Sequence, residues 1–245
     1  MTRLELIGVE GLPEVRPGDD LGELISSRSK LETGDVLVVA QKVVSKSEGR
    51  LISLQTVKAS DEAVRIAATL VAEPDPRMVQ VILDESVRVV RSNRVLITET
   101  RHGFVCANGG VDHSNVPGED ELTLLPEDPD ASAKRLRARL RELAGVDVGV
   151  IVSDTFGRPW RLGIVNVALG VAGLPASIDL RGSVDDAGKE LHATVLAIAD
   201  ELAAAAGLVM GKTSRTPAVI IRGLALQGSG TGRDLVRTAD EDLFR

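Results

Sequence analysis

The 245-residue chain has few aromatic residues, one cysteine and no long apolar run. Aromatic side chains are 2% of it, with one Trp and no Tyr, so it lacks the stacking platforms that single-stranded nucleic acids need. Cys106 alone excludes an internal disulfide and fits a reducing compartment. No stretch of about 18 apolar residues and no apolar signal-peptide core occur. We therefore expect a cytoplasmic protein that does not enter a membrane.

The charge balance is acidic, with a formal net charge of -7 at pH 7. A broad basic face for nucleic acid is therefore not expected, whereas a local basic pocket for phosphates is compatible with this charge. Hydrophobic residues make up 43% of the chain, enough to bury a sizeable core. The length suits one large domain or two small intertwined ones.

The hydrophobic periodicity alternates between two and 3.6 residues, which predicts a mixed α/β fold. Strands are expected at 4–9, 35–41, 86–92, 94–100, 103–110 and 217–223, and helices at 16–30, 60–73, 128–145 and 186–207. Three of the expected strands therefore follow one another directly, between the second and third helices.

Three of the expected helices carry specific predictions. Ser60 is expected to cap the second helix. The inward residues are predicted to be Ala63, Val64, Ala67, Leu70 and Val71 in that helix and Leu136, Leu140 and Leu143 in the next. The last helix is expected to be the longest, to stop at Gly207 and to contain His192 as a structural residue.

Three motifs invite a functional interpretation that we reject. The segment Gly207–Ser214 resembles a P-loop, but it has three residues between its glycines instead of four, and a helix precedes it. The segment Gly228–Gly232 does not match the dinucleotide pattern, and we expect a mobile tail there. Cys106 has no evident His partner and is expected to be a buried small side chain.

The segment NGGVDHSNVPG, Asn108–Gly118, follows an apolar strand. Its glycines permit a turn that presents Asp112 and Asn115 from a loop. Asp112 could bind a divalent cation and Asn115 a phosphate or nucleobase. The alternative is an Asx turn in which both side chains cap their own backbone, and the residues alone leave both open.

The segment GVIVSDTFGRPWR, Gly149–Arg161, predicts an apolar strand that ends in a turn at Asp154 and Thr155. Ligands in α/β proteins gather beyond the carboxyl ends of strands. A carboxylate with a neighbouring hydroxyl suits Mg²⁺ or Mn²⁺, and Arg158 and Arg161 would complement anionic oxygens. The alternative is that Asp154 pairs with one of these arginines to brace the turn.

Two earlier segments add groups suited to phosphate. GLPEVRPGDD offers a turn near the N-terminus, and AQKVVSKSEGR offers Gln41, Lys42, Ser45 and Lys46. Lysine ammonium groups are compact charges suited to triphosphate oxygens. Each could be a solvated surface charge, but together these segments describe a metal-nucleotide site without a P-loop.

Five successive segments resemble the coenzyme F420-0:L-glutamate ligases, also called gamma-glutamyl ligases. The resemblance spans residues 4 to about 222 and rests on these blocks: GLPEVRPGDDL, AQKVVSKSEGR, LITETRHGFVCANGGVDHSNV, VIVSDTFGRPWRLG and IADELAAAAGLVMGK. It implies one gamma-glutamyl ligase domain over residues 1–245 with an unusual two-part α/β fold, neither P-loop nor Rossmann. It also implies a homodimer with sites near the subunit interface.

The resemblance further implies a GTP-dependent ligase with divalent metal, Mg²⁺ or Mn²⁺, and K⁺ as a further candidate ion. It would join L-glutamate to a carboxylate of the deazaflavin phospholactate precursor and then add gamma-linked glutamates. By resemblance the GTP contacts are Gly11, Leu12, Pro13, Glu14, Gln41, Lys42, Lys46, Asn115, Met210, Gly211 and Lys212. The metal ligands are Asp112, Asp154 and Thr155, and the catalytic residues are Asp112, Asp154 and Lys46.

One position departs from the family pattern. Archaeal members of the family often have Met-Gly-Gln, with the Gln helping to bind metal, where this chain has Met210-Gly211-Lys212. An ammonium cannot ligate a cation, so either Lys212 contacts phosphate or a second metal has fewer protein ligands.

A GTP-dependent small-molecule kinase and a non-catalytic nucleotide-binding protein are the alternative functions. The segment RDLVRTADEDLFR also resembles the sequence that leads into a second, nitroreductase-like domain in actinobacterial relatives, and the chain could be either a single-domain ligase or such an N-terminal domain.

Overall fold

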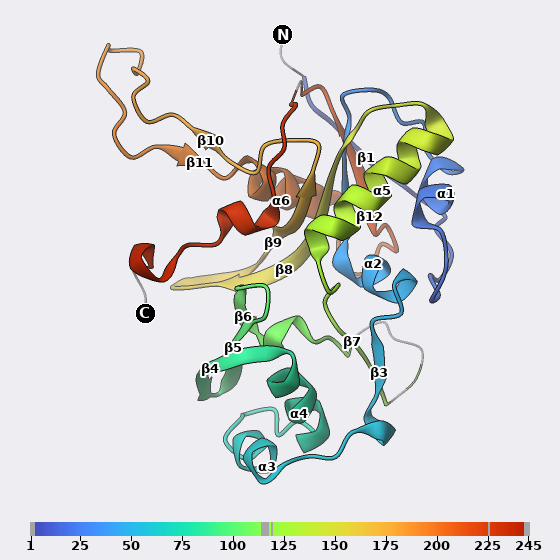
Figure 1. Ribbon diagram of the computed structural model, residues 1–245, viewed down its shortest axis with the longest axis vertical. Coiled ribbons are helices and arrows are strands. Elements are labelled where there is room, and N and C mark those ends of the chain that lie inside the picture. Colours follow the sequence, from blue (N-terminus) through green and yellow to red (C-terminus); the bar gives the residue numbers. More distant parts are fainter. Residues whose placement is uncertain (1–2, 114–117, 119, 225, 243–245) are drawn as a thin grey trace.

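The computed structural model describes residues 3–113, 118, 120–224 and 226–242, which fold into two lobes (Figure 1). The larger lobe, formed by the described residues of 3–50 and 125–242, is built on one five-stranded sheet. The smaller lobe, formed by the described residues of 51–124, comes in the chain between the second and fifth α-helices. The junction between the lobes is therefore where residues distant in sequence can meet.

The main sheet has the strand order β1-β12-β2-β8-β9. Its strands are β1 (Glu5–Gly8), β12 (Ala218–Arg222), β2 (Val36–Ala40), β8 (Gly149–Arg158) and β9 (Arg161–Ala172). Only β2 and β8 are parallel neighbours, and the other three pairs are antiparallel. Doubly wound nucleotide-binding folds have mostly parallel sheets, so the predicted mixed α/β class without a Rossmann arrangement is confirmed.

Helices cover both faces of this sheet. Helices α1 (Leu21–Ser26) and α5 (Pro129–Ala144) cover one face, and α6 (Ile198–Met210) covers the other. Leu37 and Val39 of β2 pack toward α1 and α5, whereas Val36 and Val38 pack toward α6. Because both faces are buried, the strand is apolar throughout instead of alternating.

The smaller lobe has its own core, which includes Leu54, Ile82, Leu96 and Leu122. Its helices are α3 (Asp61–Ala67) and α4 (Pro76–Asp84), with short turns η1 (Leu54–Thr56) and η2 (Asn108–Gly110). Its strands are β3 (Leu51–Ser53) paired with β7 (Glu121–Thr123), and β4 (Ser86–Asn93), β5 (Val95–Thr100) and β6 (Val105–Ala107) in one sheet. Helix α2 (Gln41–Ser47) lies between this lobe and the main sheet (Figure 1).

The prediction of a helix over 186–207 is wrong at both ends. Residues 186–197 belong to a protruding arm that contains the strand pair β10 (Ile178–Asp179) and β11 (Val195–Leu196), and His192 is exposed there (Figure 1). The Asp185 carboxylate accepts hydrogen bonds from the backbone of Ala187 and Lys189, a local turn that competes with helix. At the other end α6 runs past Gly207 to Met210. Because α6 begins only at Ile198, α5 is the longest described helix.

Two helix-face predictions are partly wrong. Ser60 caps α3 as predicted, accepting a hydrogen bond from the backbone N–H of Ala63, but α3 ends at Ala67. Val64 and Val71 are 49% and 71% exposed, because the short helix leaves them outside the contact face. In α5, Leu136 and Leu140 are buried, whereas Leu143, in the last turn, is 40% exposed.

The glycine-rich segment Gly228–Gly232 is packed against the main lobe, contrary to the expected mobile tail. A Cβ at Gly232 would meet the carbonyl oxygen of Leu169 at 2.0 Å, so only glycine fits. The Gly232 N–H also donates to Oδ1 of the buried Asp130 at 2.7 Å. The same oxygen accepts from Val171 N–H at 2.8 Å, which ties the C-terminal segment, α5 and β9 together. The turns η3 (Gly232–Leu235) and η4 (Ala239–Glu241) follow.

Candidate active site

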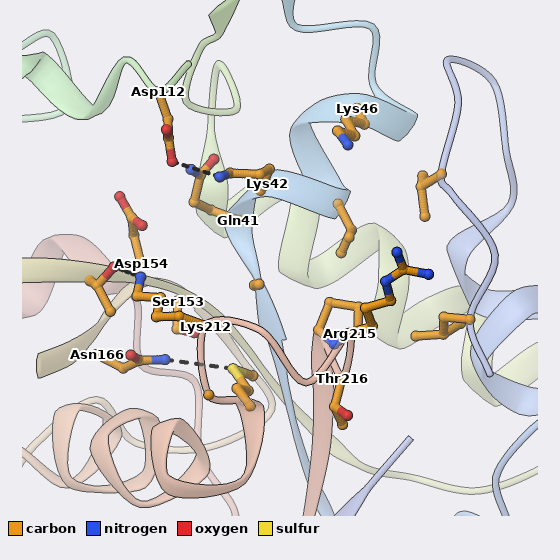
Figure 2. Close-up of a pocket in the computed structure, with 18 of the residues that line it drawn as sticks. Gln41, Lys42, Lys46, Asp112, Ser153, Asp154, Asn166, Lys212, Arg215 and Thr216 are labelled. Atoms are coloured by element: carbon orange, nitrogen blue, oxygen red, sulfur yellow. Dashed lines mark hydrogen bonds and ion pairs between the residues drawn. The ribbon is translucent and has the colours of Figure 1, made fainter. Parts of the chain in front are cut away.

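A cavity of about 790 Å³ opens where the parallel strands β2 and β8 end, at the junction of the two lobes. Figure 2 shows its polar side chains converging from both lobes. The residues that line it are Leu12, Pro13, Glu14, Val15, Ala40, Gln41, Lys42, Val43, Lys46, Asp112, Ser153, Asp154, Thr155, Asn166, Met210, Gly211, Lys212, Thr213, Arg215, Thr216 and Pro217.

Helix α2 supplies the first wall because it starts directly after β2. Gln41 is 2% exposed, and its Oε1 accepts a hydrogen bond of 2.9 Å from the Ser45 hydroxyl. Lys46 is 4% exposed, and its Nζ pairs with the Glu14 carboxylate from the N-terminal loop. A buried ammonium requires such a partner, so the loop and the helix are held together across the cavity.

Asp112 reaches the cavity from the smaller lobe. The predicted glycine turn before it is present, with φ of 58° at Gly109 and 72° at Gly110. The backbone of Asp112 then exchanges two hydrogen bonds with Thr123, at 3.0 and 2.8 Å, which fix its position. Its Oδ2 lies 2.6 Å from Lys42 Nζ, so this ion pair joins the two lobes.

Asp154 lies within a strand, so the expected turn at this residue is wrong. Strand β8 continues to Arg158 as half of a hairpin with β9, because β9 supplies hydrogen-bond partners beyond the end of β2. The Asp154 and Asp112 side chains point toward one another in Figure 2. Burial raises the pKa of Asp154 to about 6; the backbone N–H of Thr155 lowers it, the charge of Asp112 raises it, and Lys212 and Lys42 lower it.

The cavity wall on the side of α6 carries a second set of polar side chains. Lys212, just after α6, donates a hydrogen bond of 2.5 Å from Nζ to Thr155 Oγ1. Asn166 lies directly opposite Thr155 in the β8–β9 ladder. The hydroxyl of Ser153, a residue 1% exposed, has no hydrogen-bond partner among the described residues. An unpartnered buried hydroxyl is costly, so this one is suited to a bound ligand.

Twelve of the fourteen residues implied by the resemblance line this one cavity. Gly11 does not line it; its carbonyl oxygen accepts a hydrogen bond from Arg28 in the adjoining loop. Asn115 lies outside the described residues. Arg158 and Arg161 do not complement the site as expected, because they lie at the exposed end of the β8–β9 hairpin, where Arg158 binds the carbonyl oxygen of Leu162.

The sequence reasoning missed five polar residues of the cavity: Ser153, Asn166, Thr213, Arg215 and Thr216. A lone Asn in the apolar stretch of β9 was an available signal for Asn166. Arg215 has a left-handed backbone with φ of 55°, uncommon for a residue with a side chain. That conformation, set by the turn between α6 and β12, has no sequence signature.

The donor set fits a hard divalent cation. Asp112 and Asp154 offer carboxylate oxygens to one space, and Mg²⁺ and Mn²⁺ prefer oxygen ligands. Burial is the main cause of the raised pKa of Asp154, and the charge of Asp112 adds to it; a cation between the two carboxylates would relieve that repulsion. Asp112 and Asp154 are the two carboxylates that would hold the cation; in the described part of the chain, no three His, Cys, Asp or Glu side chains gather to hold a metal.

The fold and the cavity together define a mixed α/β protein that gathers lysines and carboxylates at the carboxyl ends of two parallel strands. The family model for F420-0:gamma-glutamyl ligase matches residues 11–223. The chain belongs to this family. Among the described residues no helix combines the length and apolar character needed to cross a bilayer.

Curated relatives align with the chain over nearly their whole length. The chain is 49% identical to "Coenzyme F420:L-glutamate ligase" of Methanopyrus kandleri over 255 residues, which cover 100% of both proteins. It is 48% identical to the protein of that name from Haloarcula marismortui, over 99% of this chain and 96% of the relative. The protein of that name from Archaeoglobus fulgidus is 46% identical, with 99% and 97% covered.

Proposed function

We propose that this protein is a GTP-dependent ligase that attaches L-glutamate to the deazaflavin phospholactate precursor of coenzyme F420 and extends a gamma-linked glutamate tail. One observation carries the proposal: twelve residues implied by the ligase resemblance, from distant parts of the sequence, line one cavity. The full-length similarity to ligases of that name supports it.

A carboxylate needs activation before an amine can displace one of its oxygens. In the proposed first step, a carboxylate oxygen of the precursor attacks the γ-phosphorus of GTP, the bond to the β-phosphate oxygen breaks, and GDP leaves. In the second step the glutamate amine attacks the acyl phosphate carbon, the C–N bond forms, phosphate leaves and the amine loses a proton. The reaction consumes one GTP for each glutamate added.

The cavity side chains suit the first step. Phosphoryl transfer is catalysed mainly by positioning and by neutralising charge. Lys46 and Lys42 face the cavity from α2, and we assign them to the phosphates of GTP, with Gln41 and the loop from Leu12 to Glu14 beside the nucleotide. When GTP binds, Lys46 would exchange part of its pairing with Glu14 for phosphate oxygens.

Asp112 and Asp154 would hold Mg²⁺ or Mn²⁺, which when bound neutralises phosphate charge. The resemblance adds Thr155, whose hydroxyl lies against Lys212. Asp154 must be ionised to bind a cation, and the neighbouring Lys212 and Lys42 favour that form.

We also propose that the protein is a homodimer and that it acts in the cytoplasm.

Product analysis tests the proposed reaction. The protein is incubated with GTP, Mg²⁺, precursor and L-glutamate, and the products are analysed by mass spectrometry and a phosphate assay. We expect the precursor mass to rise by glutamate units, with one GDP and one phosphate for each unit. A stable phosphorylated product formed without glutamate would instead identify a kinase, and no turnover would identify a nucleotide-binding protein.

A further inference from the structure

The hydroxyl of Thr155 accepts a hydrogen bond from a positively charged side chain of the protein itself, the ammonium group of Lys212. Lys212 Nζ donates to Thr155 Oγ1 at 2.5 Å, a short charge-assisted hydrogen bond. The two residues come from different elements, Thr155 from β8 and Lys212 from the turn after α6. Both line the cavity, and the charge of Lys212 also acts on the neighbouring Asp154.

An ammonium and a divalent ion do not share one neutral hydroxyl well. A metal ligand lies about 2.0 to 2.2 Å from Mg²⁺ or Mn²⁺, so an ammonium on the same oxygen would be only a few ångströms from the ion and would be repelled by it. A carboxylate differs, because its negative charge is spread over two oxygens. Asp112 can therefore pair with Lys42 through Oδ2 and still attract a divalent ion.

The carboxylates that line the cavity also favour one divalent ion over two. Among the described residues that line it, the carboxylates are Glu14, Asp112 and Asp154, and Glu14 pairs with Lys46. Asp112 and Asp154 are the two carboxylates that point toward one another (Figure 2), enough for one divalent ion. A second ion at Thr155 would have a neutral hydroxyl as its own protein ligand and an ammonium beside it.

We infer that Lys212 is a built-in cation of this site, so that Thr155 positions Lys212 instead of ligating metal and the protein binds a single divalent ion between Asp112 and Asp154. This inference rests on the proposed metal role of those two aspartates. It assigns two kinds of positive charge to the anionic reactants: an exchangeable ion on the Asp112 side and a fixed ammonium on the α6 side.

Binding of Mn²⁺ tests the inference without any measurement of turnover. The free Mn²⁺ signal in electron paramagnetic resonance is titrated with the full-length protein, first with metal alone and then with GDP present. We expect one ion bound per chain, with none of the dipolar broadening that two adjacent Mn²⁺ ions produce. Two bound ions with that broadening would overturn the inference and leave the proposed reaction standing.

Two substitutions sharpen the test. Thr155→Val keeps the shape of the side chain and removes the hydroxyl, so we expect Mn²⁺ affinity to change less than twofold; a loss of tenfold or more would show that Thr155 is a ligand. Lys212→Gln removes the charge and offers a carboxamide oxygen, so we expect a second Mn²⁺ ion to bind. If Lys212→Gln still binds one ion, Lys212 does not exclude the second and the inference is wrong.

Matched controls separate this inference from the proposed function. Lys189→Gln makes the same change at an exposed residue of the arm and should leave one bound ion. Asp154→Asn should abolish binding. If the wild-type protein binds no Mn²⁺ with or without GDP, the proposed metal site fails and the inference fails with it. Circular dichroism confirms that each variant is folded.

Discussion

Lys42 of α2 and Asp112 of the smaller lobe line the cavity and form an ion pair of 2.6 Å. Their chain neighbours Val43 and Val111 belong to separate cores, so this contact couples the lobes directly at the candidate site. A ligand that draws Lys42 toward its phosphates would also act on Asp112. Nucleotide and metal binding are therefore expected to be linked, each strengthening the other.

Lys46 tests the nucleotide assignment. Replacing it by Ala removes a nearly buried ammonium, and we expect GTP affinity to fall by about 2 kcal/mol, roughly 30-fold, the size of a lost charge-assisted contact. Isothermal titration calorimetry measures this, with Lys58→Ala at an exposed position as the control. Equal GTP affinities in the two variants would remove Lys46 from the nucleotide site.

Asp154 tests the metal assignment through turnover. Asp154→Asn keeps the size of the side chain and removes its charge, so we expect turnover to fall at least about 100-fold while the protein stays folded. Asp186→Asn, on the exposed arm, should keep normal turnover. Near-normal turnover of Asp154→Asn at limiting Mg²⁺ would contradict the metal role.

The raised pKa of Asp154 predicts a pH dependence of stability in metal-free protein. Its pKa of about 6 exceeds the ordinary 3.8, so between these values the folded protein holds a proton that the unfolded chain has lost. Asp154 therefore makes the free energy of unfolding decrease as pH rises from about 4 to about 6, by at most about 3 kcal/mol.

Urea unfolding in EDTA at several pH values measures this effect. The difference in unfolding free energy between wild type and Asp154→Asn isolates it from other titrating groups. We expect Asp154→Asn to gain stability relative to wild type as pH rises over that range. A difference that does not vary with pH would mean that the carboxylate is ordinary in the folded protein.

Cys106 is buried, and its burial, with the nearby charge of Asp154, raises the pKa of the thiol to about 12. Thiolate is the reactive form, so we expect very slow reaction of the folded protein with a disulfide reagent at pH 8. The unfolded protein in guanidinium chloride should react at the rate of a free thiol. Fast labelling of the folded protein would show that the β6 region opens readily.

The end of the β8–β9 hairpin tests the proposed homodimer. Trp160 is 81% exposed, Leu162 97% and Ile164 58%, an unusual concentration of apolar surface. We propose that a second copy of this chain covers it. Light scattering should give twice the 25.9 kDa of one chain, and Leu162→Asp should shift the mass to one chain. A single-chain mass for the active wild type would exclude the dimer.

Local sequence patterns determined the class of fold and much of the site. Hydrophobic periodicities located β1, β2, β4, β5, β6, β8 and β12 and the helices α1, α3, α5 and α6, but not β3, β7, β9, β10, β11, α2 or α4. The glycines after β6 marked the turn before Asp112, and continuous segments carried the family resemblance. These features depend on short-range sterics and on burial of one face, so a sequence window contains them. The family resemblance, and not these local patterns, named the twelve residues that line the cavity.

Only the tertiary structure decided how those residues meet. Because β8 pairs with β9, Asp154 lies within a strand and Arg158 and Arg161 lie away from the cavity. The C-terminal segment packs against the main lobe through the close contact of Gly232 with Leu169. The contact of Lys212 with Thr155 spans 57 residues of sequence. Such contacts depend on which elements pack side by side in the folded core. A local sequence pattern does not specify contacts between residues so far apart in the chain.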